Sequence, residues 1–119
     1  AGTIGTMGHY CYFNLDNGTD EDYTLPFDFP ISGDFTIVVN ALATTLAGST
    51  LVDVSVAGSV DGENYVDLHT DVIDGVQMND TLAIGIYDYD GKGRMPFMRL
   101  GINPLTARDE TILIAIVPQ

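Results

Sequence analysis

The sequence is poor in basic residues. Four lysines and arginines stand against seventeen aspartates and glutamates in 119 residues, which gives a formal net charge of -13. Such a surface repels phosphate groups, so we expect neither nucleic acid nor an anionic membrane as a partner. Solubility is the simplest explanation of the acidity. A high-salt setting, bridging by divalent cations and a basic partner surface are the alternatives.

Cysteine and catalytic motifs are equally scarce. Cys11 is the only cysteine, which excludes an intrachain disulfide, and its apolar strand pattern predicts a small core residue rather than a nucleophile. His9 and His69 are the only histidines, and the sequence contains no G-x-S-x-G, P-loop, H-E-x-x-H or C-x-x-C motif. We therefore expect a protein that is not an enzyme and that has no catalytic residues, cofactor or metal site.

Residues 88–94, DYDGKGR, resemble the start of a calcium loop through Asp88 and Asp90. Lys92 and Arg99 stand where an EF-hand needs ligands, so we predict a hairpin turn instead. No apolar run is long enough to span a membrane, and the start of the sequence lacks the regions of a secretion signal. These absences favour synthesis in the cytoplasm.

Apolar and polar residues alternate along the chain, and no segment shows the helical period of about 3.6 residues. Short alternating segments recur between turn residues. The pattern predicts an all-β fold: a single antiparallel β-sandwich or jelly-roll-like barrel of about seven or eight short strands. We expect residues 1–8 to form an extended N-terminal arm and residues 9–119 the single sandwich domain. Residues 112–117 are apolar throughout, which predicts a strand buried on both faces.

Residues 52–68 contain the clearest hairpin. A two-residue turn would bury Asp67 among valines, which is costly. We therefore predict a three-residue loop that ends at a left-handed Gly62 and sets Val56 opposite Val66. A five-residue loop has the same side-chain parity and is the alternative.

Two stretches carry a resemblance to a known family: VSVAGSVDGENYVDL at 54–68 and FMRLGI at 97–102. Small structural proteins of tailed phages contain strands of the types V-x-G-S-x-D-G, N-[W/Y]-V-D-L and [F/Y]-[M/L]-R-L-x-I. Tyr65 stands where that pattern often has tryptophan. The chain thus resembles a tailed-bacteriophage capsid decoration (cement) protein or a related small virion β-sandwich protein.

The resemblance implies a structural virion protein that binds the outer surface of a phage capsid and bridges capsid subunits to stabilise the shell. It implies the major capsid protein as partner, a location on the capsid surface, and a homo-oligomer, with a trimer favoured over a dimer. A carbohydrate- or receptor-binding module and a head or tail accessory protein remain the alternatives.

Large side chains on the faces opposite the predicted core are the candidate contact residues. Such residues mark a central strand, a subunit contact or, for tyrosines, a sugar site. We expect the subunit or capsid interface to include residues of the N-terminal arm and of these faces: Ile4, Met7, Tyr10, Tyr12 and Phe97.

Overall fold

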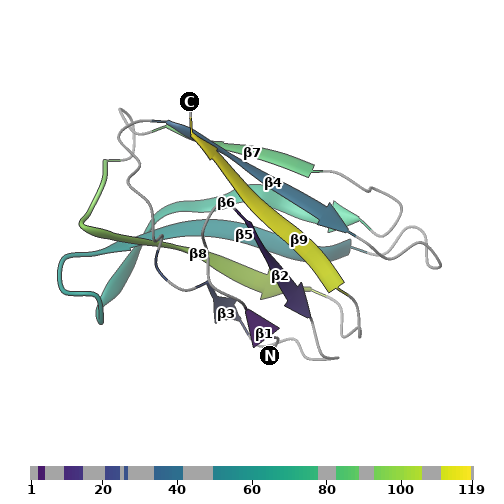
Figure 1. Ribbon diagram of the computed structural model, residues 1–119, viewed down its shortest axis with the longest axis horizontal. Helices are drawn as coiled ribbons and strands as arrows, with labels where there is room; N and C mark the ends of the chain where they lie inside the picture. The colour runs from purple at the N-terminus through teal and green to yellow at the C-terminus, as the bar shows by residue number, and fades with distance from the viewer. Residues whose placement is uncertain are drawn as a thin grey trace.

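The described part of the chain consists of strands packed as two antiparallel sheets (Figure 1). The computed structural model describes residues 3–4, 10–14, 21–24, 26, 34–41, 50–77, 83–88, 93–105 and 111–118. The predicted all-β sandwich is confirmed. Within these ranges no helix could cross a lipid bilayer.

One sheet has the order β1-β2-β9-β4-β7 and the other the order β3-β8-β5-β6. The strands are β1 (Thr3–Ile4), β2 (Tyr10–Asn14), β3 (Asp22–Tyr23), β4 (Phe35–Ala41), β5 (Thr50–Ser59), β6 (Tyr65–Gln77), β7 (Ala83–Tyr87), β8 (Phe97–Pro104) and β9 (Thr111–Pro118). The last strand, β9, lies at the centre of the five-stranded sheet. We call the two sheets five-stranded and four-stranded below, counting these strands.

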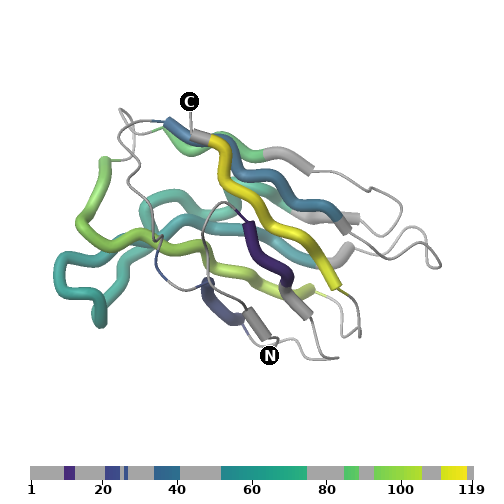
Figure 2. Tube along the Cα trace, in the orientation of Figure 1, coloured from purple at the N-terminus to yellow at the C-terminus, as the bar shows by residue number. Residues whose placement is uncertain are grey.

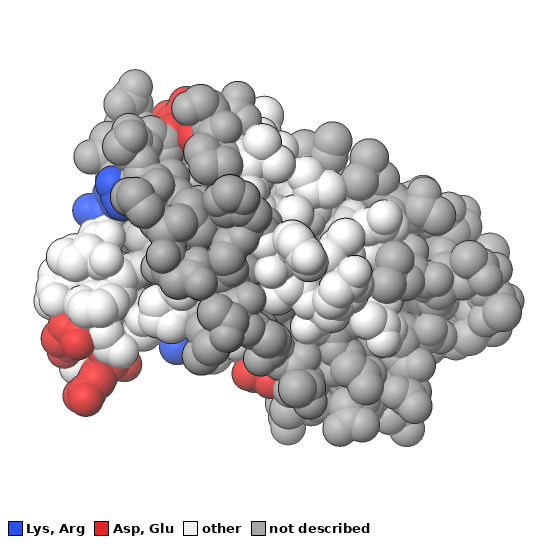
Figure 3. Space-filling view, in the orientation of Figure 1, with Lys and Arg blue, Asp and Glu red and all other residues white. Residues whose placement is uncertain are grey.

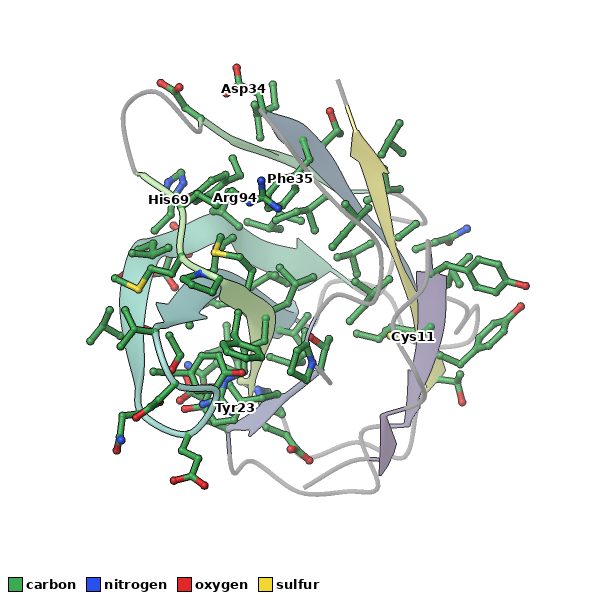
Figure 4. The ribbon with its side chains drawn as sticks, turned by 60° about the vertical axis from the view of Figure 1, so that its left-hand side comes forward. Cys11, Tyr23, Asp34, Phe35, His69 and Arg94 are labelled. Carbon is green, nitrogen blue, oxygen red and sulfur yellow. The ribbon has the colours of Figure 1, made fainter. Side chains whose placement is uncertain are left out.

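Alternate residues of the central strands point inward and fill the space between the sheets. The buried set includes Phe35, Ile37, Val39, Val52, Val54, Val56, Leu100, Ile102, Ile112, Ile114 and Ile116. Cys11 also belongs to this core, as predicted, and lies on the inner side of β2 (Figure 4). Burial raises the pKa of the Cys11 thiol to about 11, so the thiol stays protonated at neutral pH.

The environment of β9 differs from the prediction for residues 112–117. Its isoleucines are buried, but Leu113 and Ala115 are only partly buried and Val117 is exposed. The four-stranded sheet covers the inner face of β9, and in the described ranges nothing covers the outer face. The expectation of a strand buried on both faces is therefore wrong.

The β5–β6 hairpin turns through a five-residue loop, residues 60–64, because Ser59 pairs with Tyr65. The predicted three-residue loop is wrong, and the five-residue alternative of the same parity is confirmed. Gly62 is left-handed as predicted, with φ 81°. The turn projects beyond the five-stranded sheet at the left of Figure 2.

Farther from the turn, irregularities shift the register of β5 against β6. Val56 lies opposite His69 and not opposite Val66, which corrects the predicted pairing. The longer strand absorbs extra residues: β6 has 13 residues where β5 has 10. Asp71 has a φ of 53°, in the left-handed region that non-glycine residues seldom adopt.

The two sheets approach each other closely where β7 passes β6. A Cβ on Gly85 would lie 2.6 Å from the carbonyl oxygen of Val72 and 2.7 Å from Cγ1 of Ile73. Backbone atoms cannot give way as a flexible side chain can. Only glycine therefore fits at this position of β7.

We expect Gly85→Ala to lower the free energy of unfolding by about 1–3 kcal/mol, because the added methyl overpacks a closed site. The control is Gly101→Ala, whose Cβ would meet the Tyr23 ring at 3.4 Å and Ser55 at 3.8 Å, ordinary contacts or nearly so. The control should change stability by no more than about 0.5 kcal/mol. Urea denaturation of both variants checks this, and equal losses would show that the approach of β7 to β6 is not a constraint.

Candidate interaction surface

The outer face of the five-stranded sheet consists of the residues that alternate with the core. Residues paired across neighbouring strands point to the same side of a sheet, and three such rows cross this face. They are Tyr10–Ala115–Val38, Tyr12–Leu113–Asn40 and Val117–Thr36–Ile86. We call the seven apolar and aromatic members of these rows the apolar face: Tyr10, Tyr12, Val38, Ile86, Leu113, Ala115 and Val117.

Four members of the apolar face are exposed to solvent, and none of the residues in its three rows is charged. The exposed fractions are 57% for Tyr10, 56% for Tyr12, 61% for Ile86 and 48% for Val117. In Figure 3 the described residues over the middle of this side are neither acidic nor basic. Charged residues usually occupy about a quarter to a third of a soluble surface. An uncharged face of this kind on a protein of net charge -13 is typical of an interaction site.

Tyr10 and Tyr12 form an aromatic pair on the apolar face. Their ring centroids are 6.1 Å apart and their planes meet at 86°, an edge-to-face arrangement. Aromatic pairs of this geometry are favourable, and tyrosine adds a hydroxyl that can find a partner at the rim of an interface. The pair therefore offers a large, preformed contact area.

The structure separates the five residues that we predicted for the interface. Tyr10 and Tyr12 lie on the apolar face. Phe97 begins β8 in the other sheet and is exposed there, so it does not join the tyrosines. Ile4 lies in β1, which pairs with β2 of the same chain. Met7 lies outside the described residues.

Sequence reasoning missed the aliphatic part of the apolar face, chiefly Val38, Ile86, Leu113 and Val117. For Leu113 and Val117 the signal was present, because residues 112–117 are apolar on both sides of the strand. That signal was interpreted as burial within the domain. An apolar run in a strand does not distinguish a layer of the same chain from a partner protein.

On the outer face of the four-stranded sheet, Arg99 lies between two tyrosine rings. Its guanidinium carbon is 3.8 Å from the centroid of Tyr23 and 3.7 Å from that of Tyr65. The three residues come from β3, β8 and β6, so the stack ties both edge strands of this sheet to β8. Arg99 therefore occupies one face of each tyrosine ring.

Tyr23 also binds its neighbour in the chain. Its hydroxyl donates a hydrogen bond to the Glu21 carboxylate, and this bond raises the pKa of Tyr23. The phenol therefore stays protonated, and it holds the Tyr23 ring against Arg99.

The loop of the β5–β6 hairpin is organised by Asp61 and Ser59. Oδ1 of Asp61 accepts hydrogen bonds of 2.8 Å from the Ser59 hydroxyl and from the backbone N–H groups of Glu63 and Asn64. Oδ2 accepts one of 2.7 Å from the Asn64 amide. The Ser59 oxygen in turn accepts from the N–H groups of Asp61 and Gly62, at 3.2 and 2.9 Å. The loop thus has one defined conformation.

Three carboxylates gather near the bulged part of β6. Oxygen atoms of Asp53, Asp71 and Asp74 all lie within 4.8 Å of one another. Calcium and magnesium take such oxygen ligands, but exposed acidic groups also gather without an ion. The cluster alone does not establish a metal site. In the DYDGKGR stretch, Asp88 is exposed, and residues 89–92 lie outside the described residues.

The comparisons with known proteins bear on the fold alone. No protein-family model and no curated protein sequence matches the chain. Among solved structures, the chain is similar to the pre-peptidase C-terminal domain of a collagenase from Bacillus anthracis. The TM-score is 0.56 at 13% sequence identity, over 94% of this chain and 92% of that chain. At this identity the likeness supports the β-sandwich and says nothing of activity.

The Arg99 stack predicts a measurable coupling energy. Arg99→Met keeps most of the aliphatic stem but removes the charge, and we expect it to cost about 1 kcal/mol, because each ring loses a partly desolvated cation–π contact. Tyr65→Leu should cost clearly less in the Arg99→Met background than in the wild type. A double-mutant cycle by urea denaturation measures this difference. Strict additivity of the two changes would show that the stack stabilises nothing.

The Asp61 network predicts a pH dependence. Hydrogen bonds from the backbone N–H groups of Asn64 and Glu63 hold the pKa of Asp61 well below its ordinary value. A carboxylate with a lowered native pKa stabilises the fold above its unfolded pKa of about 3.9, and this stabilisation is lost as the pH falls towards the native value. We expect Asp61→Asn to be less stable than the wild type at neutral pH, with a difference that shrinks below about pH 4.

Urea denaturation across this pH range measures the difference. Glu63→Gln is the matched control, since it removes one charge from the same loop and leaves the hydrogen bonds of Asp61 in place. If the difference in unfolding free energy between Asp61→Asn and the wild type stayed constant to the lowest pH measured, the lowered pKa of Asp61 would be contradicted.

Proposed function

We propose that the protein is a structural virion component that binds the outer surface of a phage capsid and bridges neighbouring capsid subunits. The apolar face carries this proposal. It is a broad, uncharged sheet surface, presented by an otherwise strongly acidic protein, and it contains no group with catalytic chemistry. The sequence resemblance to capsid decoration proteins supports the choice of the major capsid protein as partner.

Burial of the apolar face provides the energy for binding. Interface cores are depleted in charged residues and enriched in tyrosine, which is the composition of this face. Each Å² of apolar surface removed from water contributes roughly 25 cal/mol, against the entropy lost on association. The polar members of the rows, Thr36 and Asn40, are neutral, so a partner can cover them without burying a charge, provided that it supplies hydrogen bonds to them.

The acidity supports an outward position on the virion. A protein of net charge -13 does not compete with the shell for the packaged genome, because it is repelled by DNA phosphate. The proposed role needs neither nucleic acid nor a membrane as partner, and no catalysis. A trimer, or a dimer, at a symmetry position of the shell would multiply the contacts of one chain.

The test is binding to purified shells that lack the protein. We expect the double variant Ile86→Thr/Val117→Thr to bind about tenfold or more weakly, because each change removes roughly 1 kcal/mol of apolar burial. Threonine keeps the β-branched shape, so the fold should survive. Leu105→Thr is the control, because Leu105 is an exposed apolar residue that follows β8 in the other sheet.

Two further measurements separate the proposal from its alternatives. Cryo-electron microscopy of particles with bound protein should place it on the capsid lattice, and a location only at the neck or tail would indicate an accessory protein. Shells that carry the protein should denature at higher temperature than bare shells. If the denaturation temperature of fully decorated shells equals that of bare shells, a stabilising role is ruled out.

A further inference from the structure

The tip of the β5–β6 hairpin is a second exposed apolar site, remote from the apolar face. By the hairpin tip we mean residues 60–67. Val60 is 73% exposed, the largest fraction among the described large hydrophobic residues, and Val66 is 53% exposed. Figures 1 and 2 show that the hairpin extends past the end of the five-stranded sheet.

The geometry of the turn does not explain the valines. The turn needs hydrogen bonds within the loop and a residue that adopts a positive φ. Asp61 and Asn64 supply the hydrogen bonds, and Gly62 supplies the positive φ. A β-branched residue at position 60 contributes nothing to that chemistry, and it exposes apolar surface to water. The residue there is consistent with a contact to something outside the chain.

The loop of the hairpin tip is also held by its own hydrogen bonds. The carboxylate of Asp61 accepts four hydrogen bonds and the Ser59 oxygen accepts two, all within the loop. A Cβ on Gly62 would lie 3.5 Å from the Phe97 ring, so the loop rests on the first residue of β8. A preorganised element loses little entropy when it binds.

The charge of the hairpin tip limits which partner surfaces it can bind. Asp61 and Glu63 are exposed in the loop that follows Val60, and acidic atoms gather at this end of the molecule in Figure 3. On the outer face of the hairpin, Arg99 is stacked on Tyr65. An exposed apolar side chain beside two acidic residues fits a pocket with an apolar floor and a basic rim. It does not fit a second copy of a chain with net charge -13.

We propose that the hairpin tip is a second docking element, which inserts Val60 and Val66 into an apolar pocket with a basic rim on a shell subunit. The inference rests on the proposed function and extends it, because bridging requires contacts with two subunits. The apolar face would bind one subunit, and the hairpin tip its neighbour.

The first experiment measures binding of the Val60→Thr/Val66→Thr variant to the same purified shells. Both changes lie at exposed positions and keep the side-chain shape, so urea denaturation should show a stability close to that of the wild type. We expect about tenfold weaker binding, with Leu105→Thr again as the unaffected control. The Glu63→Gln variant should bind with a smaller dependence on salt than the wild type, because one acidic charge of the loop is gone.

The second experiment detects the contact directly. A photoreactive benzoylphenylalanine is introduced at position 60, or at position 105 as the control, and the shells are irradiated after binding. We expect a crosslink from position 60 to the major capsid protein and none from position 105. Weaker binding together with this crosslink supports the docking element, and either result without the other overturns it.

The remaining outcomes are also decisive. A crosslink that joins two copies of this chain would overturn the basic partner and show self-association. If the Val60→Thr/Val66→Thr variant binds shells as tightly as the wild type and position 60 gives no crosslink, the hairpin proposal is overturned and the proposed function is left intact. Failure of the wild type to bind shells at all would overturn both.

Discussion

The packing of the two sheets through alternate aliphatic residues is the constraint on which the rest of the structure depends. The buried isoleucines of β9 face the buried valines of β5, and the two-residue period of a strand then sends every intervening residue outward. Folding therefore requires apolar residues at only half of the positions of β9. Threonines at positions 113 and 117 would satisfy the same core. The fold does not require the outward-facing residues of β9 to be apolar. The apolar face therefore needs an explanation other than the stability of the domain.

The same period explains how much could be predicted from the sequence. Alternation in residues such as Val52, Val54 and Val56 is a local signal, and it identified the strands, the sandwich and most of the core. The Arg99 stack gives no local signal, because its members come from three strands. The irregular register of β6 is hidden for a similar reason. In this part of β6, Val72 lies against Gly85 of β7, and no residue near it in the sequence indicates that contact.

The length of the hairpin loop is not determined by side-chain parity alone; it also depends on hydrogen bonding within the loop. Side-chain parity excluded a two-residue turn, but three- and five-residue loops satisfy it equally. The carboxylate of Asp61 separates them. It accepts hydrogen bonds from the N–H groups of Glu63 and Asn64, and a three-residue loop would commit Glu63 to the ladder opposite Ser59. An aspartate at that position therefore favours the longer loop.

Mechanical bridging needs two contacts and a stiff connection between them. The apolar face belongs to the five-stranded sheet, and the hairpin tip is an extension of β5 and β6 in the other sheet. What joins them is the close-packed core, whose interlocking side chains transmit strain instead of yielding to it. The Arg99 stack adds to this stiffness, since it clamps the edges of the sheet that carries the hairpin. A force between two shell subunits would then pass through the core of one small domain, and the charges would orient that domain. In the proposed assembly, the uncharged face would lose water at least cost, and the acidic tip would favour a basic pocket.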